Sequence, residues 1–472
     1  MNTRTFILTG IVCLLVCTST LFAGEIIPGQ MIVSASTNSL DLSKTSISGI
    51  VKVDSIKGAN LYLISFPPTV SSNTVSEQLE KMKGVLKFEP NRRIRMPDVR
   101  QIGIVQPDVE NQGVYTKGSD PDEFYEQTAV ETIKLDSAHI TATGEDVIVA
   151  VIDNGIDTNH PLFESTLTDS MYDFVDDDSS PVEDSGSAYG HGTFVSGLVL
   201  LAAPDCEIMP IRAFDEDGNG TYYDVASAIY YAIDNGANVI NMSFGSPDTS
   251  SVLLDACQEA FEEGIAMVAA AGNDSSSTVL YPAGYPWVTT VNSIDSVDVI
   301  ASFSNYGSHT DICAPGENLY SSIPGDTLWG IWSGTSFSAA LVSGVCALMI
   351  DDDPSLTTDP IRYRLRSEAE TSLDWGTVYP HDNYYGYGCL DADASVDYEV
   401  GEGVYICGDV NADGIVNSDD IYDLTDYVFY GSPTPDPLNS ADIDGEIGID
   451  IDDIVFLGNY VAGTGDEPDC SD

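Results

Sequence analysis

Basic residues are scarce in this chain of 472 residues, which has 17 Lys and Arg against 75 Asp and Glu and a formal net charge of −58. Residues 24–100 hold ten basic and seven acidic residues, whereas residues 101–472 hold six and sixty-eight. A surface this negative repels nucleic acid and anionic membranes, which excludes both as partners. Abundant carboxylates suit calcium binding or a salty habitat. The basic N-terminal piece is predicted to be a separate unit.

Long apolar runs are missing after the N-terminus, so no later stretch is predicted to cross a bilayer. Residues 1–23 are typical of an export signal, because Arg4 precedes the run FILTGIVCLLVC and Ala23 offers a small residue for cleavage. A retained N-terminal anchor is the alternative. A lipoprotein signal is disfavoured, since Cys17 follows Val16. We expect a secreted or extracellular protein.

Cysteine is also sparse, and it does not form a dense disulfide framework. Nine cysteines are present, and seven remain once the signal is removed. Only Cys407 and Cys470 are predicted to pair, because they bracket the last segment of the chain. Secretion would permit such a bond.

Hydrophobic periodicity predicts three folded units. Residues 24–97 contain strand-like runs and one helix-like stretch at 76–84, which predicts a small α+β domain. Continuous apolar strands, such as 146–153, alternate with helices, such as 191–202, over residues 120–395. This pattern predicts an α/β fold whose parallel sheet has helices on both faces. A small all-α module is expected at the end. The expected divisions are a linker at 98–119, a second linker at 396–406 and the terminal module at 407–472.

Four polar side chains are predicted to meet at the carboxyl edge of the parallel sheet. Asp153 and Asn273 each end a strand, and His191 and Ser336 each begin a helix. A serine hydroxyl becomes a nucleophile when a histidine takes its proton and a third group orients that histidine. Singly, Ser336 could cap the helix at 337–350, His191 could be structural and Asn273 could be a turn residue. Their joint placement favours catalysis.

Residues 120–395 carry the motifs VAVIDNGIDTNHPLF, GHGTFVSGLV, NVINMSFGS, VAAAGND and SGTSFSAALVSGVCALM. These five motifs, in the order Asp, His, Ser, resemble those of a subtilisin-type serine peptidase. The resemblance implies that Ser336 is the nucleophile, His191 the general base and then acid, and Asp153 the residue that holds the imidazole tautomer. Asn273 and the Ser336 backbone N–H would bind the oxyanion. A catalytically silent binding module and a peptide ligase or cyclase on the same fold stay open as alternatives.

Three residues depart from the family pattern without removing a reacting group. Asn154 stands where a small hydroxyl residue is usual, Phe194 replaces a second histidine and Ala340 replaces a proline. We expect these changes to affect rate and preference more than activity. The family default is a broad endopeptidase that prefers large apolar side chains. Phe244, beside Ser243, is expected in the core rather than in a substrate pocket.

The N-terminal domain resembles the inhibitory propeptide of these peptidases, through PGQMIV and VLKFEPNRRIR. The resemblance implies that the domain assists folding, blocks the cleft and is removed by self-cleavage between about 95 and 120. Its basic tail of Arg92, Arg93 and Arg95 leads into the strongly acidic region.

Residues 407–472 repeat with a period of 33 residues, and each copy carries oxygen ligands at calcium-loop spacing. Gly414 permits the tight turn of the first loop, whereas Ile447 stands at that position in the second, so the second loop is expected to bind more weakly. A charge-rich solvated surface is the alternative. The expected ligands are Asp409, Asn411, Asp413, the Ile415 carbonyl, Asn417 and Asp420 in the first loop, and Asp442, Asp444, Glu446, Asp450 and Asp453 in the second.

This repeat pair resembles a type I dockerin, which implies docking to a cohesin domain on a partner. Ser418, Asp419, Ile451 and Asp452 are the residues that would face the cohesin. A calcium-stabilised appendage without a partner is the alternative. Calcium in the catalytic region is implied by the family resemblance alone, with Gln127 as a candidate ligand.

Overall fold

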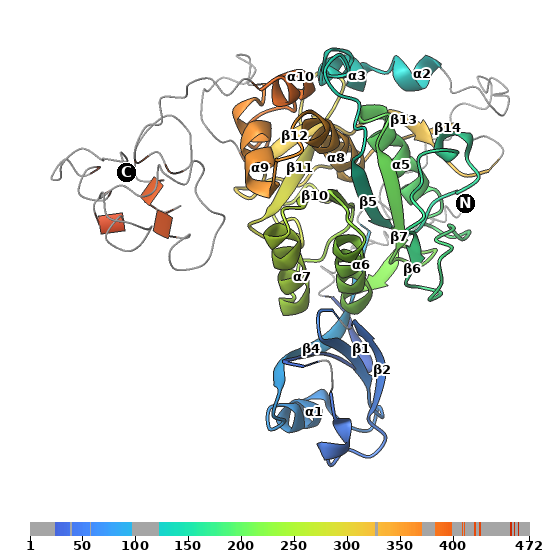
Figure 1. The fold of residues 1–472 in the computed structure, drawn as a ribbon, viewed down its shortest axis with the longest axis vertical. Helices are drawn as coiled ribbons and strands as arrows, with labels where there is room; N and C mark the ends of the chain where they lie inside the picture. The colour runs from blue at the N-terminus through green and yellow to red at the C-terminus, as the bar shows by residue number, and fades with distance from the viewer. Residues whose placement is uncertain are drawn as a thin grey trace, which may run out of the picture.

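The computed structural model describes residues 24–37, 40–56, 58–96, 122–325, 329–370 and 383–398, with a few single positions between 408 and 461. These residues form a small N-terminal domain and a large domain that lie against each other (Figure 1). The export signal, the expected self-cleavage segment and most of the repeat pair therefore lie outside the described residues.

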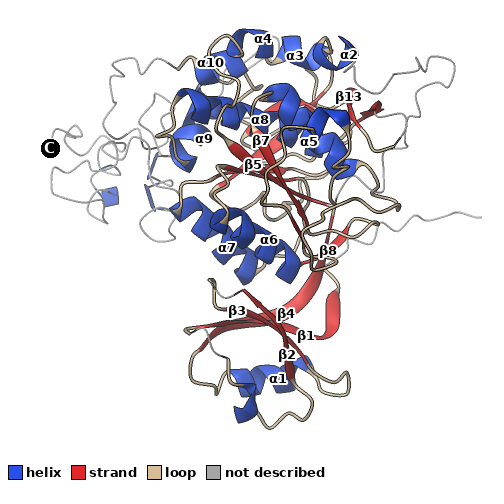
Figure 2. Cartoon of the chain, turned by 45° about the vertical axis from the view of Figure 1, so that its right-hand side comes forward, coloured by secondary structure: helices blue, strands red, loops and turns tan. Residues whose placement is uncertain are grey.

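The small domain is an antiparallel sheet with one helix on its outer face (Figure 2). Its strands lie in the order β2-β3-β1-β4. Successive side chains alternate between faces, so Met31 and Val33 pack with α1 while Ile32 packs with the large domain. The elements are β1 (Ile26–Ala35), η1 (Leu42–Lys44), β2 (Val51–Ile56), β3 (Leu61–Ser65), α1 (Ser72–Leu79) and β4 (Val85–Arg95).

A seven-stranded sheet forms the centre of the large domain, in the order β12-β11-β10-β9-β5-β7-β6. Every strand pair in it is parallel, which confirms the α/β prediction. Its strands are β5 (Ile148–Asp153), β6 (Tyr172–Asp173), β7 (Glu207–Arg212), β9 (Val239–Met242), β10 (Ala266–Ala270), β11 (Val288–Ile294) and β12 (Ile312–Pro315).

Helices cover both faces of this sheet, as the sequence predicted (Figures 1 and 2). Val149 and Val151 of β5 pack on the side of α5 (His191–Ala202) and α8 (Thr335–Asp352). Ala150 and Ile152 pack on the side of α6 (Tyr222–Asp234) and α7 (Ser251–Glu262). Both faces of β5 are buried, which explains its unbroken apolar sequence.

Shorter elements surround this framework. The strands β13 and β14 form an antiparallel pair, and β8 extends the sheet of the small domain. The remaining elements are α2 (Asp122–Tyr125), α3 (Thr128–Thr132), α4 (Leu135–Ala138), η3 (Pro161–Phe163), β8 (Asn219–Thr221), β13 (Leu319–Ser322), β14 (Trp329–Trp332), α9 (Thr358–Ser367) and α10 (Ala392–Val396).

The helix α8 is the apolar axis of the large domain. It begins and ends two residues outside the 337–350 range that the sequence predicted. By length and composition alone α8 could cross a membrane, but 89% of its 18-residue window is buried inside the protein. It is therefore a core helix, which the sheet covers on one side and α5 on another.

The sequence located the long elements more accurately than the small domain. The predicted helix at 191–202 coincides with α5, and the strand at 146–153 overlaps β5. In the small domain α1 begins four residues before the predicted start at residue 76, and β2 was not predicted. β2 is an edge strand whose first four residues, VKVD, are all exposed, so its short alternation of valine and polar residues marks no buried face.

Only a few residues after 398 are described. Asp420 is buried, and its Oδ1 accepts a hydrogen bond from the N–H of Val410 at 2.8 Å. Leu424 and Leu457, which are equivalent in the repeat, are both buried. The other ten predicted calcium ligands, the four cohesin-facing residues, Cys407 and Cys470 lie outside the described residues.

We predict that Gly344→Ala destabilises the large domain. A Cβ on Gly344 would lie 2.4 Å from the Cβ of Ala202 and 2.8 Å from the carbonyl of Val199, so α5 and α8 would have to separate. Alanine has a higher helix propensity than glycine, which stabilises the helix by about 1 kcal/mol. Overpacking destabilises the fold by about 1–3 kcal/mol. We expect a lower urea unfolding midpoint. Gly58→Ala, whose Cβ meets only a side-chain oxygen at 3.7 Å, should leave it unchanged.

Candidate active site

The four predicted catalytic residues all lie at the carboxyl edge of the parallel sheet. Asp153 is the last residue of β5, and Asn273 follows the end of β10. His191 is the first residue of α5, and Ser336 is the second residue of α8. All four are buried, so each polar group needs a specific partner.

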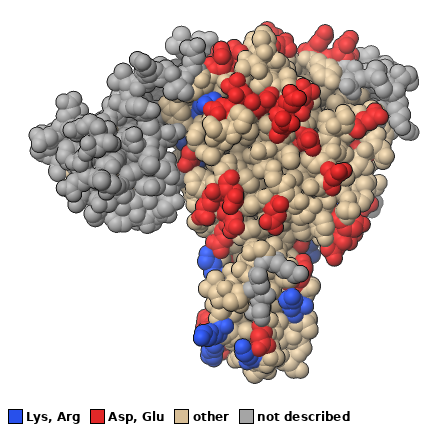
Figure 3. Space-filling view, viewed as in Figure 1, with Lys and Arg blue, Asp and Glu red and all other residues tan. Residues whose placement is uncertain are grey.

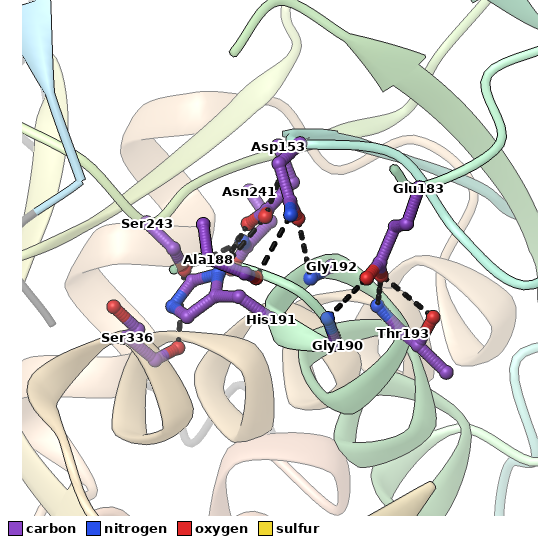
Figure 4. Close-up of polar contacts among 11 residues, drawn as sticks. Asp153, Glu183, Ala188, Gly190, His191, Gly192, Thr193, Asn241, Ser243 and Ser336 are labelled. Atoms are coloured by element: carbon purple, nitrogen blue, oxygen red, sulfur yellow. Dashed lines mark hydrogen bonds and ion pairs between the residues drawn. The ribbon is translucent and has the colours of Figure 1, made fainter. Parts of the chain in front are cut away.

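Asp153 and His191 form a direct pair. Nδ1 of His191 lies 2.9 Å from Oδ1 and 3.0 Å from Oδ2 of Asp153. A carboxylate accepts only, so Nδ1 carries the proton in this bond. Figure 4 shows the side chain of Ser336 pointing toward the other side of the imidazole. The imidazole therefore lies between a carboxylate and a hydroxyl group.

Ser336 does not cap its helix, which removes the ordinary alternative for this residue. The N-cap of α8 is Gly334, and no side chain caps it. The backbone at Ser336 is held by a buried polar chain, because its carbonyl accepts from Ser243 Oγ at 3.1 Å. Asn241 donates to Ser243 at 3.0 Å and accepts from Ser343, also on α8, at 3.0 Å.

Asn273 is oriented by the residue that precedes Ser336. Its Oδ1 accepts from the backbone N–H of Thr335 at 3.0 Å and from the Thr335 hydroxyl at 2.9 Å. These two bonds leave the amide nitrogen as the remaining polar end of the side chain. That nitrogen is buried and has no hydrogen-bond partner among the described residues. A buried amide donor without a partner costs about 1–3 kcal/mol.

The departures from the family pattern have defined contacts. Asn154 donates to the carbonyl of Ala188 at 2.8 Å and accepts from the N–H of Gly192 at 3.0 Å, so its side chain holds the backbone on both sides of His191. Only its backbone N–H bonds Asp153, at 2.8 Å.

Phe194, which stands where the family usually has a second histidine, packs among aromatic rings. Phe194 stacks on Trp332 with ring centroids 5.0 Å apart and lies 4.5 Å from the ring of Phe337. Phe337 in turn lies 5.6 Å from the ring of His191. Ala340 is buried in α8.

Glu183 is a buried carboxyl beside the site that the sequence did not indicate. It accepts from the backbone N–H of Gly190, and from the N–H and hydroxyl of Thr193 at 2.7 Å each, around the start of α5 (Figure 4). Burial raises the pKa of Glu183 to about 8, and these hydrogen bonds oppose the rise. No motif spacing signals this contact, because Glu183 lies in a loop and reaches the helix only in the folded chain.

The end of β4 lies between two segments of the large domain, beside the site. β4 pairs antiparallel with β8, with Arg93 opposite Thr221 and Arg95 opposite Asn219. On the other side the N–H of Gly245 donates to the carbonyl of Arg95 at 3.2 Å. The small domain therefore inserts an extended backbone between two segments of the large domain.

The side chain of Gln127, the candidate calcium ligand, bonds backbone groups. Its amide donates to the carbonyls of Phe124 and Tyr320 at 2.8 and 2.9 Å, and its oxygen accepts from the N–H of Tyr320 at 3.1 Å. Within the described ranges no cluster of three or more His, Cys, Asp or Glu could hold a metal ion. Phe244 is buried against Phe214, as expected of a core residue.

Known proteins resemble this chain in sequence. Subtilisin E of Bacillus subtilis (strain 168) is 36% identical over 280 residues, which are 56% of this chain and 70% of that protein. The halolysin-like extracellular serine protease Nep of Natrialba magadii is 32% identical over 287 residues, which are 58% of this chain and 52% of that protein.

A solved structure resembles the fold. Fervidolysin from Fervidobacterium pennivorans, described as a keratinolytic enzyme related to subtilisin, superposes with a TM-score of 0.66 at 25% identity. The match covers 80% of this chain but 62% of the fervidolysin chain, which is less than two thirds of it. The model of the Subtilase family (Peptidase_S8) matches residues 144–388. The chain therefore belongs to the subtilase family and is a subtilisin-like serine peptidase.

Proposed function

We propose that this protein is a secreted endopeptidase that cleaves peptide bonds with Ser336, His191 and Asp153, and that it is made as a self-processing zymogen. The observation that carries the proposal is the position of the His191 imidazole between Asp153 and Ser336 (Figure 4). Because Nδ1–H is bonded to Asp153, the Nε2 lone pair takes the Ser336 proton as the hydroxyl attacks the scissile carbonyl. The same nitrogen then returns the proton to the leaving amine.

Asn273 supplies the oxyanion hole in this scheme. Its unpartnered amide nitrogen is a donor already held in place through Thr335, so it needs no reorganisation when negative charge develops. The backbone N–H of Ser336 is the second donor. The positive end of the α8 dipole lies at the same place and favours the same charge.

Glu183 acts as a positioning residue for His191. It bonds the backbone on both sides of that residue, at Gly190 and Thr193, while Asn154 bonds Ala188 and Gly192. The start of α5 is thus held from two directions. Neither side chain is assigned a role in proton transfer.

The N-terminal domain inhibits the enzyme by occupying the substrate groove as a β-strand. The antiparallel bridge between Arg95 and Gly245 supports this, because a peptide in the same groove would make the same backbone bonds. Moving forward from Arg95 corresponds to moving back from Gly245 toward Ser243, which is bonded to Ser336. The first self-cleavage is therefore expected within a few residues after Met96.

The same domain supports folding through its contact with α6 and α7. Glu89 accepts from the hydroxyl of Ser250 and the N–H of Ser251 at the start of α7, where a negative charge is favourable. Ile32 and Leu63 join the apolar core on that face of the large domain. Basic side chains lie on the small domain and acidic side chains are spread over the large domain (Figure 3). Lys87 and Arg92 form ion pairs with Asp255 and Asp248 of the large domain.

The C-terminal repeat pair binds calcium and docks the enzyme to a cohesin-bearing partner. The buried Asp420 carboxylate, bonded to the N–H of Val410, fits the last position of a calcium loop that begins at Asp409. Calcium would neutralise the loop carboxylates so that the module can fold. Burial of both Leu424 and Leu457 agrees with two equivalent halves.

We predict that Ser336→Ala abolishes peptide hydrolysis and leaves the chain at full precursor length after signal removal. Asn273→Ala should keep KM but lower kcat by about 10²–10³, a size taken from subtilisin's own oxyanion asparagine rather than obtained from this structure. Steady-state kinetics on a peptide and mass spectrometry of the secreted product measure both effects. Normal trimming of purified Ser336→Ala would contradict self-processing, and unchanged kcat in Asn273→Ala would contradict the oxyanion assignment.

We predict that Glu183→Gln changes the pH dependence of stability. With the folded-state pKa raised from 4.5 to about 8, the native protein keeps a proton that the unfolded chain has lost, so wild-type stability falls as pH rises through this window. The stability of the glutamine variant lacks this dependence on pH. At pH 5 it should be less stable by about 1–3 kcal/mol, because its NH₂ cannot accept from Gly190 or Thr193, and this deficit should shrink toward pH 8.

Urea unfolding from pH 5 to 8 in a Ser336→Ala background, which prevents self-digestion, measures this difference. The exposed Glu164→Gln is the matched control. Parallel pH profiles for Glu183→Gln and the parent would refute the assignment.

We predict that Asp409→Ala combined with Asp413→Ala removes one bound calcium per chain, the tighter of two. Calorimetric titration of calcium into the Ser336→Ala protein measures stoichiometry and affinity. Asp136→Ala, at an exposed position of α4, should leave both unchanged. If the double variant still binds two calcium ions with unchanged affinity, the first loop does not bind calcium.

A further inference from the structure

Two cysteines that the sequence did not pair meet at the edge of the parallel sheet. Cys313 in β12 and Cys389 are partners in a parallel β-bridge, so their backbones lie side by side. The N–H of Cys313 donates to the carbonyl of Gly388 at 2.9 Å, and the N–H of Leu390 donates to the carbonyl of Cys313 at 2.8 Å. The two sulfur atoms are in contact, at 2.9 Å.

The surroundings favour a covalent pair over other uses of two thiols. Both cysteines are buried and pack with Ile294 and Tyr385. No third His, Cys, Asp or Glu joins them in a metal-binding group among the described residues. Neither cysteine belongs to the Ser336 site. Two facing thiols in an exported protein have one common chemical outcome, which is a disulfide.

We propose that Cys313 and Cys389 form a disulfide during export, and that it clamps the strand supporting the nucleophile. The oxidant is a disulfide-bonded thiol reagent or oxidoreductase of the export compartment. One cysteine thiolate attacks that disulfide and releases the first thiol. The second cysteine attacks the mixed disulfide, which forms the Cys313–Cys389 bond and releases the second thiol. Two electrons pass to the oxidant, and the two cysteine protons leave with the released thiols.

The disulfide stabilises the turn that carries Ser336, because the segment directly after Cys313 is hydrogen-bonded to that turn. Directly after Cys313, the carbonyls of Ala314 and Pro315 accept from the Ser338 hydroxyl at 3.0 and 3.2 Å. The carbonyl of Gly316 accepts from the N–H of Gly334 at 2.8 Å. These bonds fix the chain on both sides of Ser336. A cross-link between positions 76 residues apart encloses all of α8 and α9 and restricts the unfolded chain strongly.

Burial decides when the bond forms. It raises the pKa of the Cys313 thiol well above its usual range, so little reactive thiolate exists in the folded protein. Oxidation therefore precedes closure of the sheet edge, and reduction requires unfolding. The disulfide is a structural bond and not a reversible switch of the folded enzyme.

Peptide mapping of the exported full-length chain in a Ser336→Ala background tests the bond. The protein is unfolded in guanidinium, alkylated, reduced, and alkylated again with a second reagent. Cys313 and Cys389 should take only the second label and appear in one cross-linked peptide before reduction. The buried Cys206, Cys257 and Cys346 should take the first label and serve as internal controls. First-label alkylation of Cys313 and Cys389, or pairing of either with another cysteine, would overturn the proposal.

Heat inactivation of the active enzyme tests the clamp. The half-life of wild-type activity should be several-fold longer than that of Cys313→Ala/Cys389→Ala. Cys346→Ala, which also removes one buried thiol, should shorten the half-life less. Reductant added under partly unfolding conditions should shorten the half-life of wild type but not that of the double variant. Equal sensitivity of both to reductant would refute the clamp. The peptide map needs no variant at the cysteines, so it decides the bond even if the double variant does not fold.

Discussion

Close packing of α5 against α8 is the constraint on which the site depends. Gly344 of α8 leaves room for Ala202 and Val199 of α5, so the two helices touch with almost no side chain between them. Both helices also pack on the same face of the sheet. Their first turns are therefore fixed relative to each other and to the end of β5. That is why His191 reaches Asp153 and why the Ser336 side chain points toward His191 (Figure 4).

The few described basic residues of the large domain are used in ion pairs. All five of its described basic residues form ion pairs. Arg212 is buried and joins Asp173, Asp176 and Asp184. The charged surface of the large domain is therefore mostly acidic, which complements the basic residues of the N-terminal domain. These five residues are Lys134, Arg212, Arg362, Arg364 and Arg366.

The sequence predicted what depends on local pattern. A buried parallel strand must be apolar on both faces, so β5 and its end at Asp153 were recognisable, and His191 was correctly placed at the start of a helix. Glu183 was missed because its contacts join a loop to a helix start, and no periodicity records them. The partner of Cys313 was missed for the same reason, since 76 residues separate it from Cys389 and only the sheet brings them together.

The proposed maturation explains why such long-range contacts matter. On the proposed scheme the N-terminal domain contributes Glu89 at the start of α7 and apolar residues against α6 and α7, and then it is removed. The mature enzyme must keep its shape without those contacts, amid peptidase molecules that digest any unfolded chain. The remaining support for Ser336 is internal, from Ser243 on one side and β12 on the other. A covalent bond at Cys313 is most effective in that position, because it holds the strand whose carbonyls hold the nucleophile's turn.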